Sequence, residues 1–420
     1  MTTMASAGER TQRLVALAGE LADDFATRAD EHDQQNTFPF ENFDRLKDSG
    51  YMSLPVPEEL GGLGGSLLDF AMCQERLAQG CGSTALAANM HLFALGSMME
   101  NLLNPPETFR APSESDVSAE VLAATARMMA TMLVQQKLVI GGGFTEAEIG
   151  GNWGFPTTTA VRQEHNDVPG FVLNGRKTFT SLSPIIDLFS VNTSTTDLDG
   201  KPVIGLFVVP RGTPGIEIVE TWDTMSMRAT ASHDMVIKDC WVPQQACVGL
   251  RAPGDTDVGA NVLLAWFCCS VASVYLGVAT AARNYAVEWA KTRKPVLFER
   301  PIGHFPGVQF HVADMEIELT ASRALIHDTA RQWMSGGLRA REDLARIVMV
   351  KTQATNAAIR VVEQAMSIVG APGIFRKSPM QRFYRDVRPG PFHPMTNDVA
   401  KELIGKTALG IPMEFEPRWG

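Results

Sequence analysis

The spacing of apolar side chains divides the chain into a helical block, a β-rich block and a second helical block. In the first block, apolar residues recur three and four positions apart from Leu14 to Phe25, which places them on one face of a helix. Ser66 is expected to cap a later helix, because its hydroxyl can accept a hydrogen bond from a free backbone N–H. The further helices expected here are Pro39–Lys47, Ser66–Gln79, Ala87–Leu102 and Ala119–Gln136.

From about residue 139 to residue 243 the apolar residues fall in short runs separated by turn residues. Asn174-Gly175 and Asp199-Gly200 both predict hairpin turns, because these residue types accept a positive φ. Strands at this spacing indicate an antiparallel barrel or sandwich, and we expect a barrel. The expected strands are Thr157–Arg162, Gly170–Leu173, Lys177–Thr180, Leu188–Ser194, Val203–Val209, Ile216–Val219 and Asp234–Ile237.

The last block is helical again and its helices are long. They are expected over Val258–Lys291, Pro306–Ser335, Arg341–Val369 and Thr396–Leu409. Long antiparallel helices of this kind indicate a four-helix bundle. The sequence therefore predicts an α+β chain with a helical domain (1–138), a β-barrel domain (139–245) and a C-terminal helical bundle (246–420).

Charge and cysteine usage narrow the function classes. The net charge of -10 argues against a basic nucleic-acid surface and against attraction to an anionic membrane. The six cysteines form no Cys-x-x-Cys pair, which indicates buried thiols in a reducing compartment. The start of the chain lacks a secretory pattern, and the apolar run Val262–Ala281 carries polar side chains typical of a buried core helix. A cytoplasmic protein is expected.

Five motifs occur in an order and at distances that resemble the acyl-CoA dehydrogenase superfamily. Arg385-Asp386 matches an Arg-Asp pair that the family carries near its C-terminus, and the ending Asp239–Pro243 echoes the close of its β-domain. The resemblance covers nearly the whole chain. The other motif segments are Pro57–Gly65, Phe144–Asn152, Leu173–Ser181 and Met227–Ser232.

The resemblance implies a flavin, FAD with FMN as the alternative, held between the β-domain and the C-terminal bundle. No Gly-x-Gly-x-x-Gly loop is present, so a Rossmann site is not expected. The adenosine end of FAD is implied to lie across an interface in a homodimer or homotetramer. The family pattern is altered there, since Pro295 stands in place of an arginine, Glu299 of a glycine and Ser367 of a glutamine. The cofactor-contacting residues that the resemblance implies are Phe144, Thr145, Gly150, Gly151, Phe179, Ser181, Arg293, Phe298, Gly370 and Thr396.

The usual catalytic glutamate of the superfamily is missing. Counted from Arg385 without gaps, the family's Tyr-Glu-Gly-Thr element falls on His393-Pro394-Met395-Thr396. The second position where members keep this carboxylate, within Leu263–Ser270, also has none. The remaining candidate is His393, because a neutral imidazole can act as acid or base near pH 7. Its surroundings also resemble the monooxygenase branch of the superfamily.

Other polar residues are weaker candidates. Asp398 and Glu402 share one face of a predicted helix and could be displaced bases, although a solvated helix start is the common role of such a pair. His91 could line the pocket, or it could be a hydrogen-bonded core histidine. His233, His304 and His311 lack metal-ligand spacing, so no catalytic metal is expected. The helix expected to line the pocket carries Trp266, Phe267, Ser270 and Tyr275.

Three functions remain open at this point. The first is an FAD-dependent acyl thioester dehydrogenase with an atypical base, passing electrons to an electron-transfer flavoprotein. The second is a reduced-flavin monooxygenase that uses His393 and is supplied by a separate flavin reductase. The third is a non-catalytic flavin-binding partner subunit. A dehydrogenase would bleach its flavin on anaerobic addition of an acyl-CoA, whereas the second and third would not.

Overall fold

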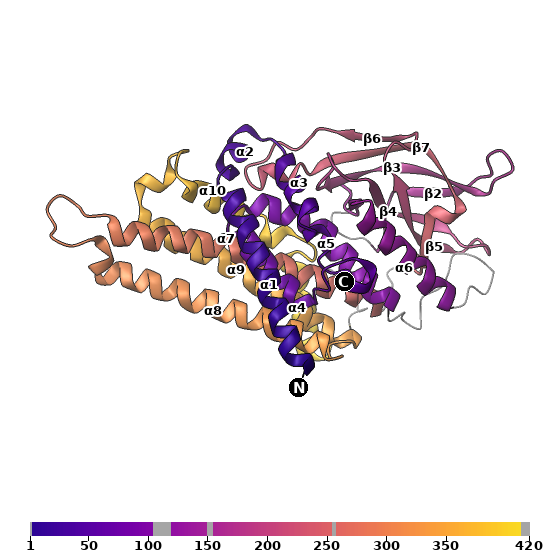
Figure 1. The fold of residues 1–420 in the computed structure, drawn as a ribbon. Coiled ribbons are helices and arrows are strands. Elements are labelled where there is room, and N and C mark those ends of the chain that lie inside the picture. The colour runs from indigo at the N-terminus through magenta and orange to yellow at the C-terminus, as the bar shows by residue number, and fades with distance from the viewer. Residues whose placement is uncertain (1, 104–118, 149–153, 254–257, 413–420) are drawn as a thin grey trace.

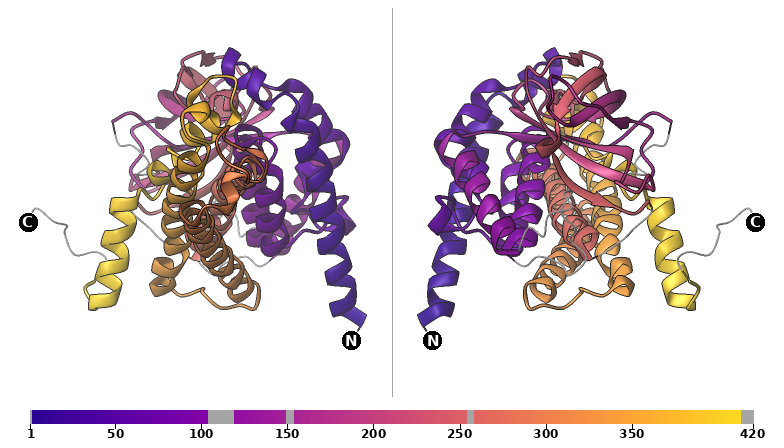
Figure 2. Two further views of the ribbon diagram at one scale, coloured as in Figure 1. Left: turned by 90° about the vertical axis from the view of Figure 1, so that its left-hand side faces the viewer. Right: turned by 90° about the vertical axis from the view of Figure 1, so that its right-hand side faces the viewer.

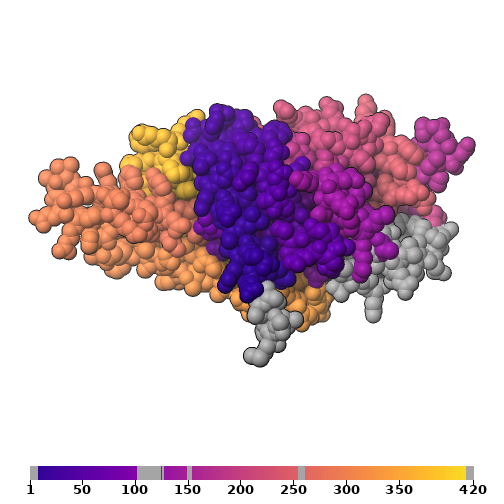
Figure 3. Space-filling model, viewed as in Figure 1, coloured from indigo at the N-terminus to yellow at the C-terminus, as the bar shows by residue number. Residues whose placement is uncertain are grey.

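The N-terminal domain is helical, as expected. The computed structural model describes residues 2–103, 119–148, 154–253 and 258–412. Ser66 forms a capping box with Asp69: its Oγ accepts from the Asp69 N–H at 3.2 Å, and the Asp69 carboxylate accepts from the Ser66 N–H at 2.9 Å. Helices α1–α3 cover the middle of one face of the molecule (Figures 1 and 3). The helices are α1 (Thr2–Ala26), α2 (Ala29–Gln35), α3 (Phe40–Asp48), α4 (Leu67–Ala78), α5 (Gly82–Leu103) and α6 (Ala119–Gln135).

The central domain is a single open sheet. Its strands run in the order β6-β7-β3-β2-β4-β5-β8, with β1 parallel to β4 off this path. The predicted closed barrel is wrong, because β6 and β8 end the sheet and do not pair with each other within the described residues. The strands are β1 (Ile140–Gly143), β2 (Thr159–Arg162), β3 (Gly170–Thr180), β4 (Leu188–Thr196), β5 (Pro202–Pro210), β6 (Ile216–Val219), β7 (His233–Pro243) and β8 (Cys247–Arg251).

Asn174-Gly175 is not the predicted hairpin turn. Both residues lie inside the eleven-residue strand β3, at a register shift against β7. Glycine is required at 175 because a Cβ there would lie 2.4 Å from Oγ1 of Thr158, which directly precedes β2. The Asn174 amide oxygen accepts the Asp239 N–H at 2.8 Å. The prediction at Asp199-Gly200 is confirmed, since Gly200 has φ of 79° in the turn between β4 and β5.

The C-terminal domain is built on three long helices. The candidate membrane span in α7 has 94% of its most apolar window buried, which identifies it as a core helix. Shorter helices complete the domain, and α11 packs on α9. The helices are α7 (Val258–Thr292), α8 (Pro306–Met334), α9 (Leu344–Val369), α10 (Pro379–Asp386) and α11 (Asn397–Leu409).

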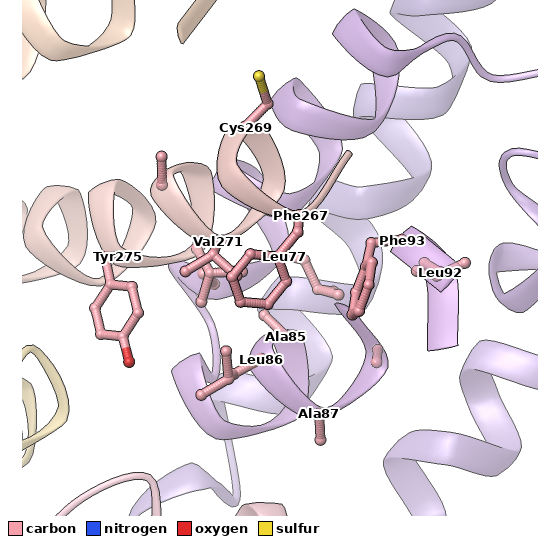
Figure 4. Packing of buried hydrophobic residues seen from close by; sticks show 14 of the residues in the cluster. Leu77, Ala85, Leu86, Ala87, Leu92, Phe93, Phe267, Cys269, Val271 and Tyr275 are labelled. Atoms are coloured by element: carbon pink, nitrogen blue, oxygen red, sulfur yellow. The ribbon is translucent and has the colours of Figure 1, made fainter. Parts of the chain in front are cut away.

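Helix α7 joins the N-terminal and C-terminal domains. It packs on α4 and α5 as well as on α8 and α9. Figure 4 shows Phe267 of α7 facing Phe93 of α5, with ring centroids 5.1 Å apart. The sheet lies at one end of the molecule and the α7–α8 hairpin at the other (Figures 1 and 2). All six cysteines are free and buried, which confirms the prediction from their spacing.

Candidate active site

Phe179 lies at the end of β3 with an unusual backbone and an exposed ring. Its φ is 55° and its side chain is 59% exposed. A bulky residue at positive φ is strained, and such strain is concentrated at functional sites. The ring meets Trp222 edge-on at 5.9 Å. Two aromatic rings therefore present an apolar face at this end of the sheet.

A chain of hydroxyl groups lies directly after Phe179. Ser181 Oγ lies 2.7 Å from Ser232 Oγ, which lies 2.7 Å from Thr230 Oγ1. The Thr230 hydroxyl also donates to the Met227 carbonyl at 2.9 Å. Because Thr230 uses its proton on that carbonyl, Ser232 donates to Thr230 and Ser181 donates to Ser232. This network fixes the position of Ser181 at the surface of the sheet.

Phe144 and Thr145 follow β1 and approach β3. The Thr178 N–H donates to the Thr145 carbonyl at 2.8 Å. Gly142 leaves room for the Phe144 ring, since a Cβ there would lie 2.3 Å from that ring. These contacts bring Phe144 and Thr145 beside the strand that carries Phe179.

A buried ion pair between Lys177 and Glu146 holds the Phe144–Thr145 segment in place. The Lys177 ammonium donates to the Glu146 carboxylate at 2.5 Å, and both side chains are fully buried. Burial alone would raise the pKa of Glu146, but hydrogen bonds from Lys177, Thr157 and Thr158 lower it to about 2. The carboxylate is therefore ionised and fully engaged, so it holds the Thr145 segment in place and is no base.

His393 lies in the loop between α10 and α11, against α7. Its Nε2 is 2.7 Å from the Tyr275 hydroxyl, and its ring meets Phe267 at 6.3 Å between centroids. Tyr275 is fully buried, and burial raises the pKa of its phenol. Burial, followed by the charge of Lys351, lowers the pKa of His393 to about 3. The imidazole is therefore neutral at physiological pH.

The Tyr275 contact determines which imidazole nitrogen carries the proton. Within the described residues, His393 Nε2 is the one hydrogen-bond partner of the Tyr275 hydroxyl. Donation by the phenol O–H to Nε2 gives this buried hydroxyl its acceptor, and in that arrangement the neutral ring carries its proton on Nδ1. Nδ1 makes no hydrogen bond to any described residue. In this tautomer, His393 offers an N–H donor rather than a free lone pair.

Two carboxylates on helices that pack against α7 are engaged by hydrogen bonds. Glu100 accepts from the indoles of Trp266 at 2.7 Å and Trp333 at 3.0 Å, and it pairs with Arg339 at 2.6 Å. Asp386 accepts the Met227 N–H at 2.8 Å, so the Arg-Asp motif ties α10 to the sheet. No described carboxylate hydrogen-bonds His393.

The weaker candidates take structural positions. His91 is buried and hydrogen-bonded on both sides: Nε2–H donates to the Met52 carbonyl at 2.9 Å, and Nδ1 accepts the Ile140 N–H at 3.1 Å. Glu402 pairs with Lys406 at 3.0 Å, and Asp398 is exposed in the first turn of α11. These placements match the structural alternative for each residue.

The remaining predicted cofactor residues do not join the site within one chain. Arg293 and Phe298 are exposed in the α7–α8 connection, at the end of the molecule away from the sheet (Figure 1). Gly370, with φ of 69°, ends α9, and Thr396 is the exposed N-cap of α11. Gly150 and Gly151 lie outside the described residues.

The residues at the sheet end suit a flavin. A planar ring system needs apolar cover and polar groups at its edge, and the Phe179–Trp222 face and the Ser181 hydroxyl oxygen provide both. Phe179 is exposed on a strained backbone, which is unfavourable unless a ligand covers it.

Comparison with known proteins gives the family. The N-terminal, middle and C-terminal acyl-CoA dehydrogenase domain profiles match residues 9–102, 141–240 and 260–409. YdbM of Bacillus subtilis (strain 168) carries the name of an acyl-CoA dehydrogenase. It is 36% identical to this chain, over 93% of this chain and 95% of its own length. The chain belongs to the acyl-CoA dehydrogenase family. Members of this family are flavin-dependent oxidoreductases, and some are monooxygenases.

Two further relatives come from another branch of this family. Amino sugar nitrososynthase RubN8 of Streptomyces rubradiris is 30% identical over 90% of this chain and 85% of its length. The structure of KijD3 with FMN and a dTDP-linked amino sugar superposes with a TM-score of 0.82, at 27% identity, over 97% of this chain and 95% of that one. The chain is thus similar both to dehydrogenases and to enzymes that act on nitrogen.

Sequence reasoning missed two residues of the site. Lys351 contacts the His393 loop from α9, and Trp222 packs beside Phe179. Neither belongs to a motif, and both contacts join segments that are separate along the chain. A long apolar helix with one lysine inside its buried stripe was the available signal for Lys351.

Proposed function

We propose that this chain is a reduced-flavin-dependent monooxygenase of the acyl-CoA dehydrogenase family, with His393 as its catalytic residue. The observation that carries this proposal is a neutral imidazole, hydrogen-bonded to Tyr275, one residue before the position at which the family's catalytic glutamate falls in the count from Arg385. The substrate is a small molecule, and a separate flavin reductase supplies the electrons.

The properties of His393 argue against proton abstraction from a thioester. An efficient general base has a pKa near the working pH, and burial holds that of His393 at about 3. The Nε2 lone pair of His393 is also occupied by the Tyr275 O–H.

The same properties suit a hydrogen-bond donor. When bound, the flavin supplies two-electron reduction and, once reduced, reaction with oxygen. In this proposal, the Nδ1–H of His393 donates a hydrogen bond to the oxygen atom on which negative charge gathers during the reaction. Tyr275 holds the ring in this tautomer, and Phe267 and Phe93 keep bulk water from the apolar side.

The similar proteins support the proposal of a monooxygenase. RubN8 is named as an amino sugar nitrososynthase, and KijD3 binds FMN together with an amino sugar nucleotide. We propose that this chain oxygenates a heteroatom or carbon of a compact substrate, with FAD or FMN as cofactor.

Dehydrogenation of an acyl thioester is the second candidate. It is favoured by the 36% identity to the acyl-CoA dehydrogenase YdbM. It requires a base that the described residues do not supply at either usual position. His393 would have to accept a proton despite its low pKa, or a group contributed by substrate would have to do so.

We also propose that a second copy of the chain completes the cofactor site. The α7–α8 connection, which carries Arg293 and Phe298, lies at the opposite end of the molecule from the sheet that carries Phe179, so these two residues can reach a flavin there only from a neighbouring copy (Figure 1). Exposed apolar side chains near them, Val296 at 100% and Leu297 at 92%, are consistent with an interface.

The test uses the purified yellow protein, reduced chemically without oxygen and then mixed with oxygenated buffer. The proposal expects reoxidation in two phases, through a transient spectrum that matches neither oxidised nor reduced flavin. His393→Gln should shorten the life of this transient. Reoxidation in a single phase, unaffected by His393→Gln, would contradict the proposal.

A further inference from the structure

Lys351 lies buried beneath the loop that carries His393. Its side chain is 0% exposed, on the core face of α9. The ammonium donates to the carbonyl oxygens of Met395 at 2.7 Å, His393 at 3.0 Å and Gly390 at 3.4 Å. An ammonium has three N–H donors, and here all three donate to carbonyl oxygens of this loop.

No carboxylate of the described residues forms an ion pair with Lys351. Buried charges are normally paired, because removing an ammonium from water is costly. Burial accordingly lowers the pKa of Lys351 to about 8. A methionine would fill the same space without this cost, so packing alone does not explain a lysine here.

The carbonyls that Lys351 binds belong to the turn that sets the direction of His393. The loop lies in close contact with α9 at Gly390, where a Cβ would lie 2.8 Å from the Thr355 side chain. Tyr275 fixes the far end of the imidazole from α7. Lys351 therefore fixes the backbone of His393, and Tyr275 fixes its ring.

We propose that Lys351 is a positioning residue for His393: its ammonium fixes the loop carbonyls, and its positive charge adds to burial in keeping the imidazole unprotonated, so that the ring presents a single N–H. This inference rests on the proposed function of His393.

Apart from Asp386 of α10, whose pKa burial raises to about 6, the other titratable groups around Lys351 and His393 keep one charge state near neutral pH. From α7 these are Cys268 and Tyr275, and burial raises the pKa of Cys268 to about 12 and that of Tyr275 above its usual value. From the loop, His393 stays neutral. Lys351 is thus the group whose charge changes near pH 8.

The experiment follows the His393 ring by NMR on the full-length protein with ¹⁵N-labelled histidine, using His393→Gln to assign its resonance. In the wild type we expect the ring nitrogens to shift with a midpoint near pH 8, as Lys351 loses its proton. In Lys351→Met this step should vanish. A wild-type ring that does not respond near pH 8, or a step that survives in Lys351→Met, would overturn the inference.

Lys351→Gln serves as a second variant in case Lys351→Met does not fold. It is neutral but keeps two N–H donors for the loop carbonyls. It should also lose the step near pH 8. Persistence of the step in Lys351→Gln would likewise reject the inference.

A double-mutant cycle on turnover tests whether Lys351 acts through His393. We expect Lys351→Met to lower turnover at least about tenfold alone and to add little in the His393→Gln background. Additive losses would show that Lys351 acts independently. Because the NMR step requires no turnover, failure of the oxygenase proposal is distinguishable from failure of this inference.

Discussion

His393 is held neutral by its surroundings, and this property decides its chemistry. We predict that His393→Ala lowers turnover about 100-fold, the usual contribution of a positioned acid or base. Asp398→Asn is the matched control, because Asp398 is exposed on α11 and contacts no described part of the site. Steady-state kinetics at pH 7 with the flavin content measured in parallel checks this. Unchanged turnover in His393→Ala would remove His393 from the mechanism.

The buried pair of Glu146 and Lys177 makes a prediction about stability. Glu146→Gln should cost about 3 kcal/mol in the free energy of unfolding, because it leaves Lys177 buried without a counter-charge. Glu288→Gln removes an exposed pair with Lys291 and should change stability by less than about 1 kcal/mol. Equal effects in denaturant melts of the two variants would contradict this account.

The pH dependence of Glu146 follows from its lowered pKa. The pKa of about 2 in the folded protein lies below the ordinary value of 4.5, so the unfolded chain binds the proton first as pH falls. The stabilisation from Glu146 is therefore complete above pH 4.5 and is lost as the pH falls toward 2. Acid melts of wild type and Glu146→Gln should converge over this window.

At the scale of elements, the α5–α7 contact depends on one glycine. A Cβ at Gly96 would lie 2.3 Å from the Trp266 ring, so Gly96→Ala should separate the helices and cost about 1–3 kcal/mol. Gly405 in α11 has nothing within 4 Å of such a Cβ, so Gly405→Ala should be neutral or stabilising by up to about 1 kcal/mol. Thermal unfolding of both variants measures this. A stable Gly96→Ala would show that α5 and α7 can move apart freely.

Helices and strands that depend on local sequence pattern could be predicted from the sequence. The Ser66 cap, the β6 strand and the long helices depend on local pattern, and each was predicted. Asn174-Gly175 was misread because glycine serves close approach as well as turns, and only the partner strand distinguishes the two. The Tyr275–His393 hydrogen bond joins residues 118 apart, and no local pattern encodes it.

For the whole molecule, an outer face of α8 carries apolar residues that no other described element covers. Phe310 and Ile317 are 68% and 67% exposed and lie two helical turns apart on one face. We predict that the double variant Phe310→Glu, Ile317→Glu lowers the solution mass from a multiple of 45.7 kDa toward 45.7 kDa, and that flavin is lost with it.

The control for assembly is Leu198→Glu in the turn between β4 and β5, which is 51% exposed and far from α8. Light scattering after gel filtration should give the wild-type mass for this variant. A wild-type protein that is monomeric and retains its flavin would contradict the shared cofactor site.

The most direct test of the central claim is anaerobic titration of the purified flavoprotein with a panel of acyl-CoAs, from short-chain to aromatic, followed by visible absorbance. A neutral imidazole, with no carboxylate at either of the family's usual positions, predicts that the oxidised flavin band persists with every member of the panel. Rapid bleaching by any one acyl-CoA would show that a competent base faces the thioester, and the assignment of His393 as a hydrogen-bond donor in a monooxygenase would be wrong.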